Sequence, residues 1–154
     1  CPLIDAAVVD RVTAELLDHP TECDYVSNVE RRSFPRGLDV EAFFFDTLLR
    51  ADRLGASAAE REHVTVGIRL THRDRFRTRD VTADRDDSDL RWTVDTAEDL
   101  ELVRALFAGL GLASRIAPYD EIITWCRAHP ELGRLDEPHH TWDPARERVG
   151  GING

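Results

Sequence analysis

The sequence predicts an α/β fold, a sheet flanked by helices, and three observations support it. Short stretches with strand-like alternation are followed by longer stretches with helical periodicity. Residues that cap helices or end them stand between these stretches. The hydrophobic fraction of 42% over 154 residues suits one globular domain with its own core. Strands that alternate with helices predict a sheet sandwiched between helical layers.

The clearest strand-to-helix transition lies in residues 90–110. Leu90, Trp92 and Val94 alternate with polar residues, which predicts a strand with one buried face. Thr96 is a good N-cap, and Asp99 three residues later resembles the acidic member of a capping box. The apolar residues that follow have helical spacing and predict one buried stripe, made of Leu100, Val103, Leu106, Phe107 and Leu110.

Asp95 stands at the end of this predicted strand, directly before the helix. A carboxylate in that position points into the crevice where open α/β sheets bind ligands. Acidic residues are also common before helices, where they cap the first turn. The pattern alone leaves both roles open for Asp95.

The other elements are predicted from caps, breakers and periodicity. An N-cap at Asp5 predicts a helix over residues 5–18, and a capping box from Ser57 to Glu60 predicts a helix that continues through His63 toward residue 69. Periodicity predicts further helices over 46–54 and 119–128, and strands over 23–28, 38–43 and, at the sheet edge, 76–81. Residues 129–154 are expected to form a loosely ordered tail.

Composition excludes several classes of protein. A formal net charge of −10 argues against a nucleic-acid or membrane-surface binder, so neither partner is expected. Three widely spaced cysteines without a zinc-binding pattern favour a reduced, cytoplasmic setting. The chain contains no methionine, so we expect it to be the downstream part of a longer protein.

Four motifs, in order, resemble the cytidylyltransferases that activate acidic sugars. Residues 94–101, VDTAEDLE, resemble the VDTPEDLE signature near the end of these enzymes, and residues 34–41, FPRGLDVE, resemble their FPxGLDVE. Residues 1–5, CPLID, resemble the end of GDCPLID, and residues 61–65, REHVT, resemble REHVTP. The family includes the sialic acid and KDO synthetases, and the most similar branch is the spore-coat polysaccharide type.

The resemblance implies a nucleotide-diphosphosugar transferase fold, a Rossmann-like mixed sheet flanked by helices, that is incomplete in this chain. Residues 1–128 would be the C-terminal part of the nucleotidyltransferase domain, because nothing here matches the family's phosphate loop. The full-length enzyme would be a homodimer that transfers CMP from CTP to an acidic sugar for surface polysaccharide biosynthesis. The family's second metal-binding aspartate would precede Cys1, so we expect the isolated fragment to be inactive.

The resemblance also assigns site residues. Asp95 would be catalytic and would hold Mg²⁺, which balances the charge that develops on phosphate oxygens. Arg36, Asp39 and Glu41 would bind the sugar. Arg36 would contact the carboxylate of the sugar, and Asp39 and Glu41 would contact its hydroxyl groups. The other interpretation of these three is a solvated strand face with Arg36 as counter-ion.

Glu62 and His63 are the remaining candidates for substrate binding, with His63 able to act as a base near neutral pH. A surface histidine beside a glutamate is the structural alternative. The family has a proline after the threonine of REHVTP, whereas this chain has Val66. Two other functions stay open: a non-catalytic binding or dimerisation piece, and a nucleotidyltransferase with a different acceptor.

Overall fold

The computed structural model describes residues 1–55 and 57–132. Its elements, in chain order, are α1 (Ala6–Asp18), β1 (Tyr25–Ser27), β2 (Glu41–Phe43), α2 (Phe45–Leu54), α3 (Ala58–Glu62), the π-helical turn η1 (Gly67–Thr71), the 3₁₀ turn η2 (Arg73–Arg75), β3 (Thr78–Asp80), α4 (Ala97–Leu110) and α5 (Tyr119–Ala128). Residues 133–154, which hold most of the predicted tail, lie outside the described part.

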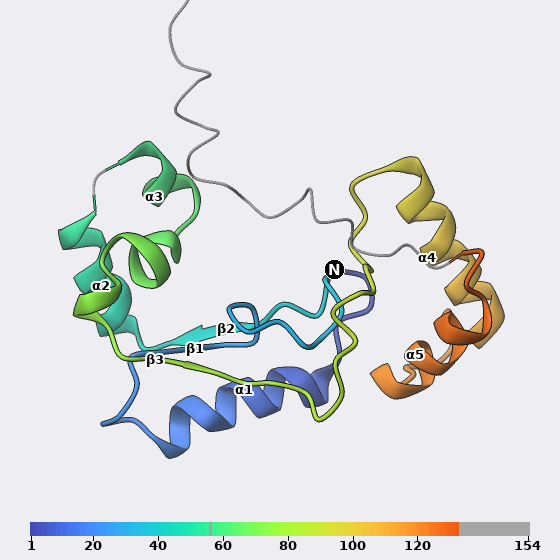
Figure 1. The fold of residues 1–154 in the computed structure, drawn as a ribbon, viewed down its shortest axis with the longest axis horizontal. Coiled ribbons are helices and arrows are strands. Elements are labelled where there is room, and N and C mark those ends of the chain that lie inside the picture. Colours follow the sequence, from blue (N-terminus) through green and yellow to red (C-terminus); the bar gives the residue numbers. More distant parts are fainter. Residues whose placement is uncertain (56, 133–154) are drawn as a thin grey trace, which may run out of the picture.

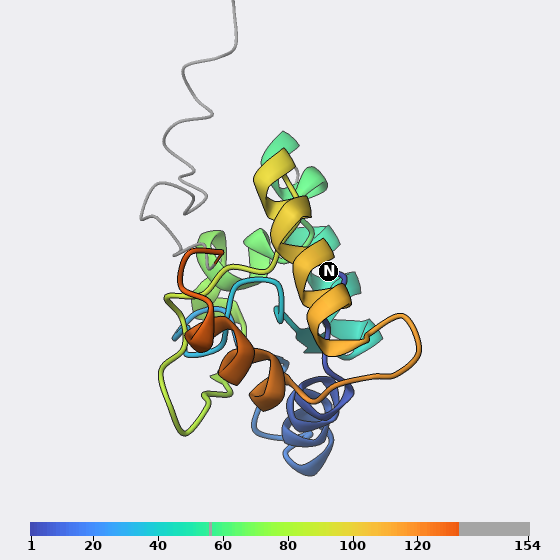
Figure 2. The same ribbon diagram turned by 90° about the vertical axis from the view of Figure 1, so that its right-hand side faces the viewer.

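The three strands form one small mixed sheet in the order β2-β1-β3. β1 runs antiparallel to β2 and parallel to β3, so the predicted strand over 76–81 does lie at a sheet edge. Helix α1 packs along one face, while α2 and α3 stand at one end of the sheet and α4 and α5 at the other (Figures 1 and 2). The mixed α/β class is confirmed, with a smaller sheet than the sequence suggested.

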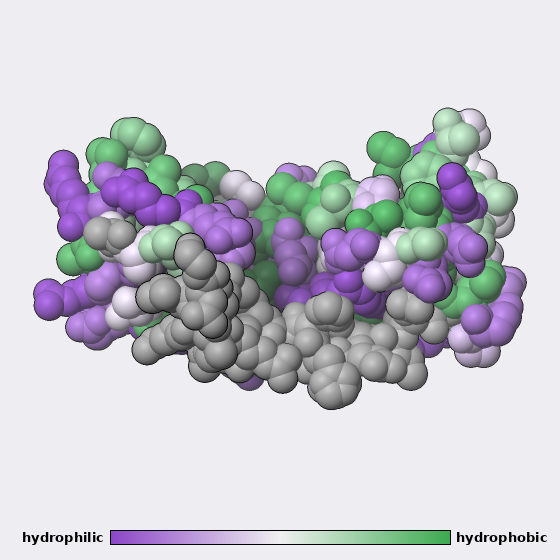
Figure 3. Space-filling model, turned by 90° about the horizontal axis from the view of Figure 1, so that it is seen from above, coloured by the Kyte–Doolittle hydropathy of each residue, from purple (hydrophilic) through white to green (hydrophobic). Residues whose placement is uncertain are grey.

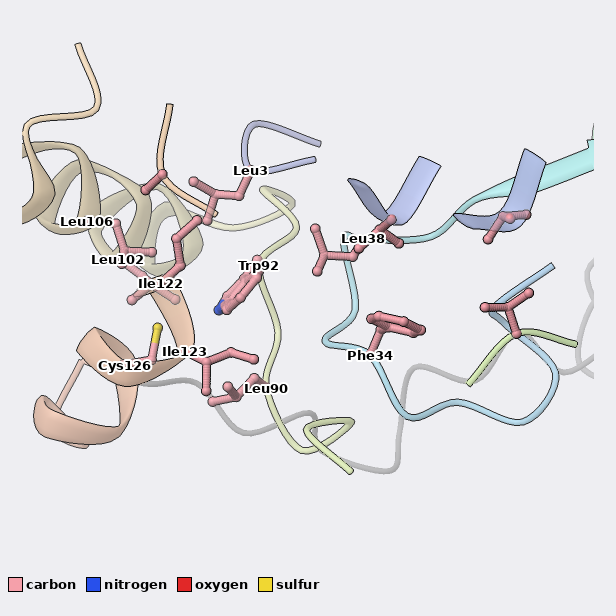
Figure 4. Packing of buried hydrophobic residues seen from close by; sticks show 14 of the residues in the cluster. Leu3, Phe34, Leu38, Leu90, Trp92, Leu102, Leu106, Ile122, Ile123 and Cys126 are labelled. Carbon is pink, nitrogen blue, oxygen red and sulfur yellow. The ribbon is translucent and has the colours of Figure 1, made fainter. Parts of the chain in front are cut away.

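One large hydrophobic cluster joins α1, α4 and α5 to the segments between the strands (Figure 4). Trp92 lies within it with 1% of its surface exposed, and Phe34 and Leu38 pack in the same cluster. A second, smaller cluster formed by Tyr25, Ala51, Ile68 and Phe76 holds α2 and η1 against the sheet. Leu90 and Trp92 are therefore buried, as the alternation at residues 90–94 predicted.

The strand predicted over residues 90–94 is much shorter than expected. Among the described residues, its pairing is a parallel bridge between Arg36 and Arg91, closed by hydrogen bonds from the Arg36 N–H to the Leu90 carbonyl (3.0 Å) and from the Trp92 N–H to the Arg36 carbonyl (2.7 Å). The turn at Gly37 carries the neighbouring segment away, and Val94 is 42% exposed. The prediction that Val94 is buried is wrong.

The helix predicted from Ser57 toward residue 69 begins as expected and ends early. Ser57 and Glu60 form the predicted capping box, but α3 ends at Glu62. The β-branched residues that follow and Gly67 are poor helix formers, and the backbone changes to the π-helical turn η1. The prediction of one continuous helix is therefore wrong.

The caps of the other helices match the prediction more closely. Asp5 caps α1 and its other oxygen accepts a hydrogen bond from the Tyr119 N–H (2.9 Å), which ties α1 to α5. Thr96 and Asp99 form the expected capping box of α4. The buried face of α4 is rotated from the predicted stripe, because Leu102 replaces Leu100 in the core. None of the described helices has the length and apolar character needed to span a bilayer.

Candidate functional site

A tight turn at Gly37 positions the segment that carries Arg36, Asp39 and Glu41. Gly37 has φ +107°, which a residue with a side chain rarely adopts. A Cβ at this position would lie 2.9 Å from the carbonyl carbon of Trp92. The turn therefore requires glycine for two reasons, its conformation and the close approach of the Trp92 backbone.

The turn leads into a cavity of about 500 Å³ between the β1–β2 connection and η1. The three predicted sugar-binding residues of the FPRGLDVE stretch all line it, and the full lining is Val29, Glu30, Arg32, Arg36, Asp39, Glu41, Arg69, Leu70 and Arg73. Hydrophilic residues gather in the middle of the upper face of the molecule, between its two raised ends (Figure 3). The structure thus brings together three candidates that the sequence placed on one motif.

Charged side chains cross-link the cavity walls. Arg32 donates two hydrogen bonds to the carboxylate of Asp39 (2.6 and 3.0 Å). Arg69 Nε lies 3.7 Å from Glu41 Oε1, which is an ion pair without a hydrogen bond. The counter-ion of Asp39 is therefore Arg32, whereas the solvated-face interpretation had assigned that role to Arg36.

Asp95 lies in the exposed turn before α4, with 65% of its side chain accessible. Its carboxylate accepts a hydrogen bond from the guanidinium of Arg91, which is itself only 10% exposed. The helix cap is made by other groups: Asp99 Oδ2 accepts hydrogen bonds from the backbone N–H groups of Asp95 and Thr96, both at 3.0 Å. The interpretation of Asp95 as the capping carboxylate is thus excluded.

Asp99 is the buried carboxylate of this turn. Burial raises its pKa, but hydrogen bonds from Asp95, Thr96 and the positive charge of Arg91 outweigh burial, and the pKa is lowered overall. Asp99 stays ionised, and Arg91 Nη2 lies 3.7 Å from its Oδ2. Arg91 therefore stands between a fixed carboxylate and the exposed carboxylate of Asp95.

The bridge between Arg36 and Arg91 connects Asp95 to the cavity. Residues paired across a β-bridge present their side chains on the same face. Arg36 lines the cavity, and its bridge partner Arg91 holds Asp95. The backbone segments that carry the sugar-binding candidates and Asp95 thus lie side by side at this bridge, although Asp95 itself does not line the cavity.

No protein-family model and no curated protein matches the sequence. Among solved structures, a cytidylyltransferase from Leptospira borgpetersenii serovar Hardjo-bovis (strain JB197) matches with a TM-score of 0.80 and 27% identity over 91% of this chain. This chain has a cytidylyltransferase-like structure. It spans 58% of the length of the Leptospira chain.

Glu62 and His63 lie apart from the other candidates of this cytidylyltransferase-like chain. Glu62 is exposed at the last turn of α3, and His63 is half-buried at its C-cap. Neither is among the residues that line the cavity beside Arg36. Their assignment to substrate binding stays a prediction that this arrangement does not favour.

Asp95 fits a magnesium site in part. Mg²⁺ at nucleotides is commonly held by one or two carboxylates together with the substrate's phosphates. Asp95 supplies one accessible carboxylate, of which Arg91 occupies one oxygen. Across residues 1–55 and 57–132, no group of three or more histidine, cysteine or acidic side chains converges on a point that could hold a metal. Magnesium binding at Asp95 stays a prediction.

Four arginines and one acid of the site were missed by sequence reasoning. Arg32, Glu30 and Arg73 lie outside the four motifs and outside the predicted helices and strands, and Arg69 was expected at the end of a helix that does not form. Arg91 was expected to point to solvent from a strand, yet it is buried between two carboxylates. Only the spacing of Arg91 from Asp95, four residues, could have hinted at this contact.

Proposed function

We propose that this chain is the acceptor-binding, C-terminal part of a cytidylyltransferase that transfers CMP from CTP to an acidic sugar and releases pyrophosphate. The observation that carries the proposal is the cavity that gathers Arg36, Asp39 and Glu41 in a chain with a cytidylyltransferase-like structure. The motif resemblance favours the spore-coat polysaccharide branch, and so a role in surface polysaccharide biosynthesis. We extend the proposal to a homodimer of the full-length enzyme, as in the family that the motifs resemble.

The proposed reaction joins an acceptor hydroxyl to the α-phosphorus of CTP. The new P–O bond forms as the bond to pyrophosphate breaks, and the hydroxyl proton is released to solvent. Mg²⁺ at Asp95 would supply charge neutralisation on the phosphate oxygens. Arg36 meets the sugar carboxylate with its planar fork, while Glu41 accepts hydrogen bonds from sugar hydroxyls.

Arg91 acts on this reaction through Asp95. Its buried guanidinium is held by Asp99 on one side and donates to Asp95 on the other. Because the Asp95 side chain is otherwise exposed, this contact restricts the directions that its carboxylate can take. Arg91 is therefore a positioning residue for the proposed metal ligand.

The test is pyrophosphate release from CTP and an acidic sugar, measured on a protein that carries this chain together with the family's phosphate loop. Asp95→Asn should lower the rate by about 100-fold or more, the size expected for losing a charge that acts on the transition state. Asp84→Asn is the matched control, because Asp84 is fully exposed and its ion-pair contact with Arg11 is long, at 3.9 Å. Undiminished release by Asp95→Asn would remove Asp95 from the mechanism.

A second measurement separates this proposal from a non-catalytic role. Calorimetry of the 154-residue chain with CTP and Mg²⁺ should show binding weaker than micromolar, because the chain has no match to the phosphate loop. Micromolar binding of CTP by the chain alone would contradict the proposed division of the site.

A further inference from the structure

The cavity beside Arg36 carries more positive charge than the sequence motif accounts for. Four arginines line it, against three carboxylates. Two of the arginines have close partners: Arg32 makes its two hydrogen bonds to Asp39, and Arg73 Nη1 donates to Glu30 Oε1 at 2.7 Å. Arg69 lies farther from its counter-ion than these two arginines do, with its Nε 3.7 Å from Glu41 Oε1.

Arg69 differs from Arg32 and Arg73 in its hydrogen bonding. Its Nε is buried and has no hydrogen-bond partner among the described residues. The carboxylate of Glu41 lies 3.7 Å away, near enough to balance the charge and too far to accept the proton. A buried donor without an acceptor is costly, so an acceptor supplied by a ligand would stabilise this group.

The backbone that presents Arg69 is unusual. Arg69 lies in η1, a single π-helical turn, and such turns occur frequently at functional sites. Ile68 of the same turn is fully buried in the smaller core cluster, which fixes the turn against the sheet. Arg73 Nη1 donates to the backbone carbonyl of Arg69 (3.4 Å), and both arginines line the cavity.

We propose that this cavity contains an oxyanion subsite in which Arg69 takes the anion through its Nε, with Arg73 alongside. A guanidinium fork matches the geometry of a carboxylate or phosphate, and a charged acceptor would satisfy the buried Nε. The choice between a carboxylate and a phosphate rests on the proposed function, which favours the carboxylate of an acidic sugar, the same group that Arg36 is proposed to meet from the same cavity. Arg69 is then a specificity-determining residue that selects acidic over neutral acceptors.

Glu41 gives the subsite a way to balance its charge without ligand. In the structure it stands as the counter-ion of Arg69 at 3.7 Å. A ligand anion at Arg69 would replace this weak pair, and the Glu41 carboxylate would be left to accept hydrogen bonds from neighbouring hydroxyls. The pair therefore fits a ligand that carries an anionic group next to hydroxyl groups, as a sugar acid does.

The test is to follow the Arg69 Nε–H resonance by NMR in the complete 154-residue chain, with the signal assigned by its loss in Arg69→Lys. N-acetylneuraminate should shift this resonance saturably, and N-acetylmannosamine, a neutral sugar, should not. CTP is the third probe. A saturable shift with CTP but not with N-acetylneuraminate would show that Arg69 binds an anion. It would overturn the proposal that this anion is the carboxylate of the acceptor sugar. No shift with any of the three would overturn the subsite.

Matched variants keep the test independent of folding. Arg69→Lys retains the charge and loses the Nε donor, so N-acetylneuraminate affinity should fall about tenfold or more, the size expected for a charge-assisted hydrogen bond. Arg104→Lys, on the exposed side of α4, should leave it unchanged. Equal affinities in both variants would contradict the proposal. These measurements do not involve pyrophosphate release, so their failure would leave the role of Asp95 standing.

Discussion

Residues 34–41 and residues 57–65 each contain a stretch that resembles a cytidylyltransferase motif (34–41 and 61–65), yet the structure places their polar residues differently. In the first stretch, Phe34 and Leu38 are buried in the main core on either side of the Gly37 turn. In the second, α3 has no buried residue and Val64 is half exposed. The polar residues of the first stretch line a cavity, and those of the second do not.

The difference teaches that apolar neighbours decide where a motif's polar residues go. Phe34 and Leu38 fix the turn in the core, so the backbone can carry Arg36 and Asp39 only toward the cavity. The 57–65 stretch has a capping box at its start and no such anchor at its end. Four sets of variants test this account, from the largest expected effect to the smallest.

The largest expected effect is on stability. Leu38→Ala should lower the free energy of unfolding by about 3 kcal/mol, because Leu38 is fully buried and its loss leaves a cavity in the main core. Val64→Ala, at an exposed position of the other stretch, should change it by less than about 0.5 kcal/mol. Urea denaturation of the two variants makes the comparison. Equal losses would show that the second motif is anchored as firmly as the first.

The next effect concerns the two glycines with positive φ. Gly37→Ala should cost about 2–3 kcal/mol, since the substitution adds an unfavourable φ and a contact of 2.9 Å with the Trp92 backbone. Gly111→Ala has the unfavourable φ alone, with nothing within 4 Å of the new Cβ, and should cost about 1 kcal/mol. Thermal unfolding of both variants measures the difference. Similar costs would mean that the close approach at Gly37 is unimportant.

A smaller effect is expected on ligand binding. Glu41→Gln should weaken binding of an acidic sugar about fivefold to tenfold, because Glu41 lines the cavity and loses acceptor capacity. Glu62→Gln, at the exposed end of α3, should leave the affinity unchanged. Calorimetric titration with N-acetylneuraminate distinguishes the two. A loss confined to Glu62→Gln would move the sugar site from the cavity to α3.

The smallest effect is a local pH dependence of the unanchored stretch. Hydrogen bonds from the hydroxyl and N–H of Ser57 lower the pKa of Glu60. The ionised Glu60 carboxylate therefore stabilises α3. This stabilisation is complete above the unfolded-state pKa of glutamate, about 4.3, and is lost as the pH falls through the lowered folded-state pKa. Amide exchange in α3 should quicken below about pH 4, once corrected for intrinsic rates, and Ser57→Ala should remove most of that change. If the corrected exchange rates did not depend on pH in the unsubstituted chain or in Ser57→Ala, the capping box would not contribute to the stability of α3.

The parts of the fold that depend on neighbours in sequence were predictable. The caps at Asp5, Ser57 and Thr96 form as expected, since a capping side chain needs only the first turn of its own helix. The strand over 90–94 was overestimated because its length depends on the neighbouring segment, which turns away at Gly37. Alternation in the sequence records a buried face and carries no information about where the partner strand ends.

The candidate site was predictable only where a motif marked it. Arg36, Asp39 and Glu41 came from one stretch, and the structure places all three at one cavity. Arg69 joins them through a π-helical turn that follows a broken helix, and helical periodicity cannot indicate such a turn. Arg91 was misplaced because its burial depends on two carboxylates contributed by the start of α4.

The central claim is that Asp95 and the cavity beside Arg36 form one site. Mn²⁺ in place of Mg²⁺ tests it directly, because the ion broadens NMR signals of nearby amides. In the 154-residue chain with CTP, we predict strong broadening at residues 93–97, weaker broadening at residues 36–37, and none at Glu62 and His63. Broadening centred on Glu62 and His63, with residues 93–97 unaffected, would contradict the account.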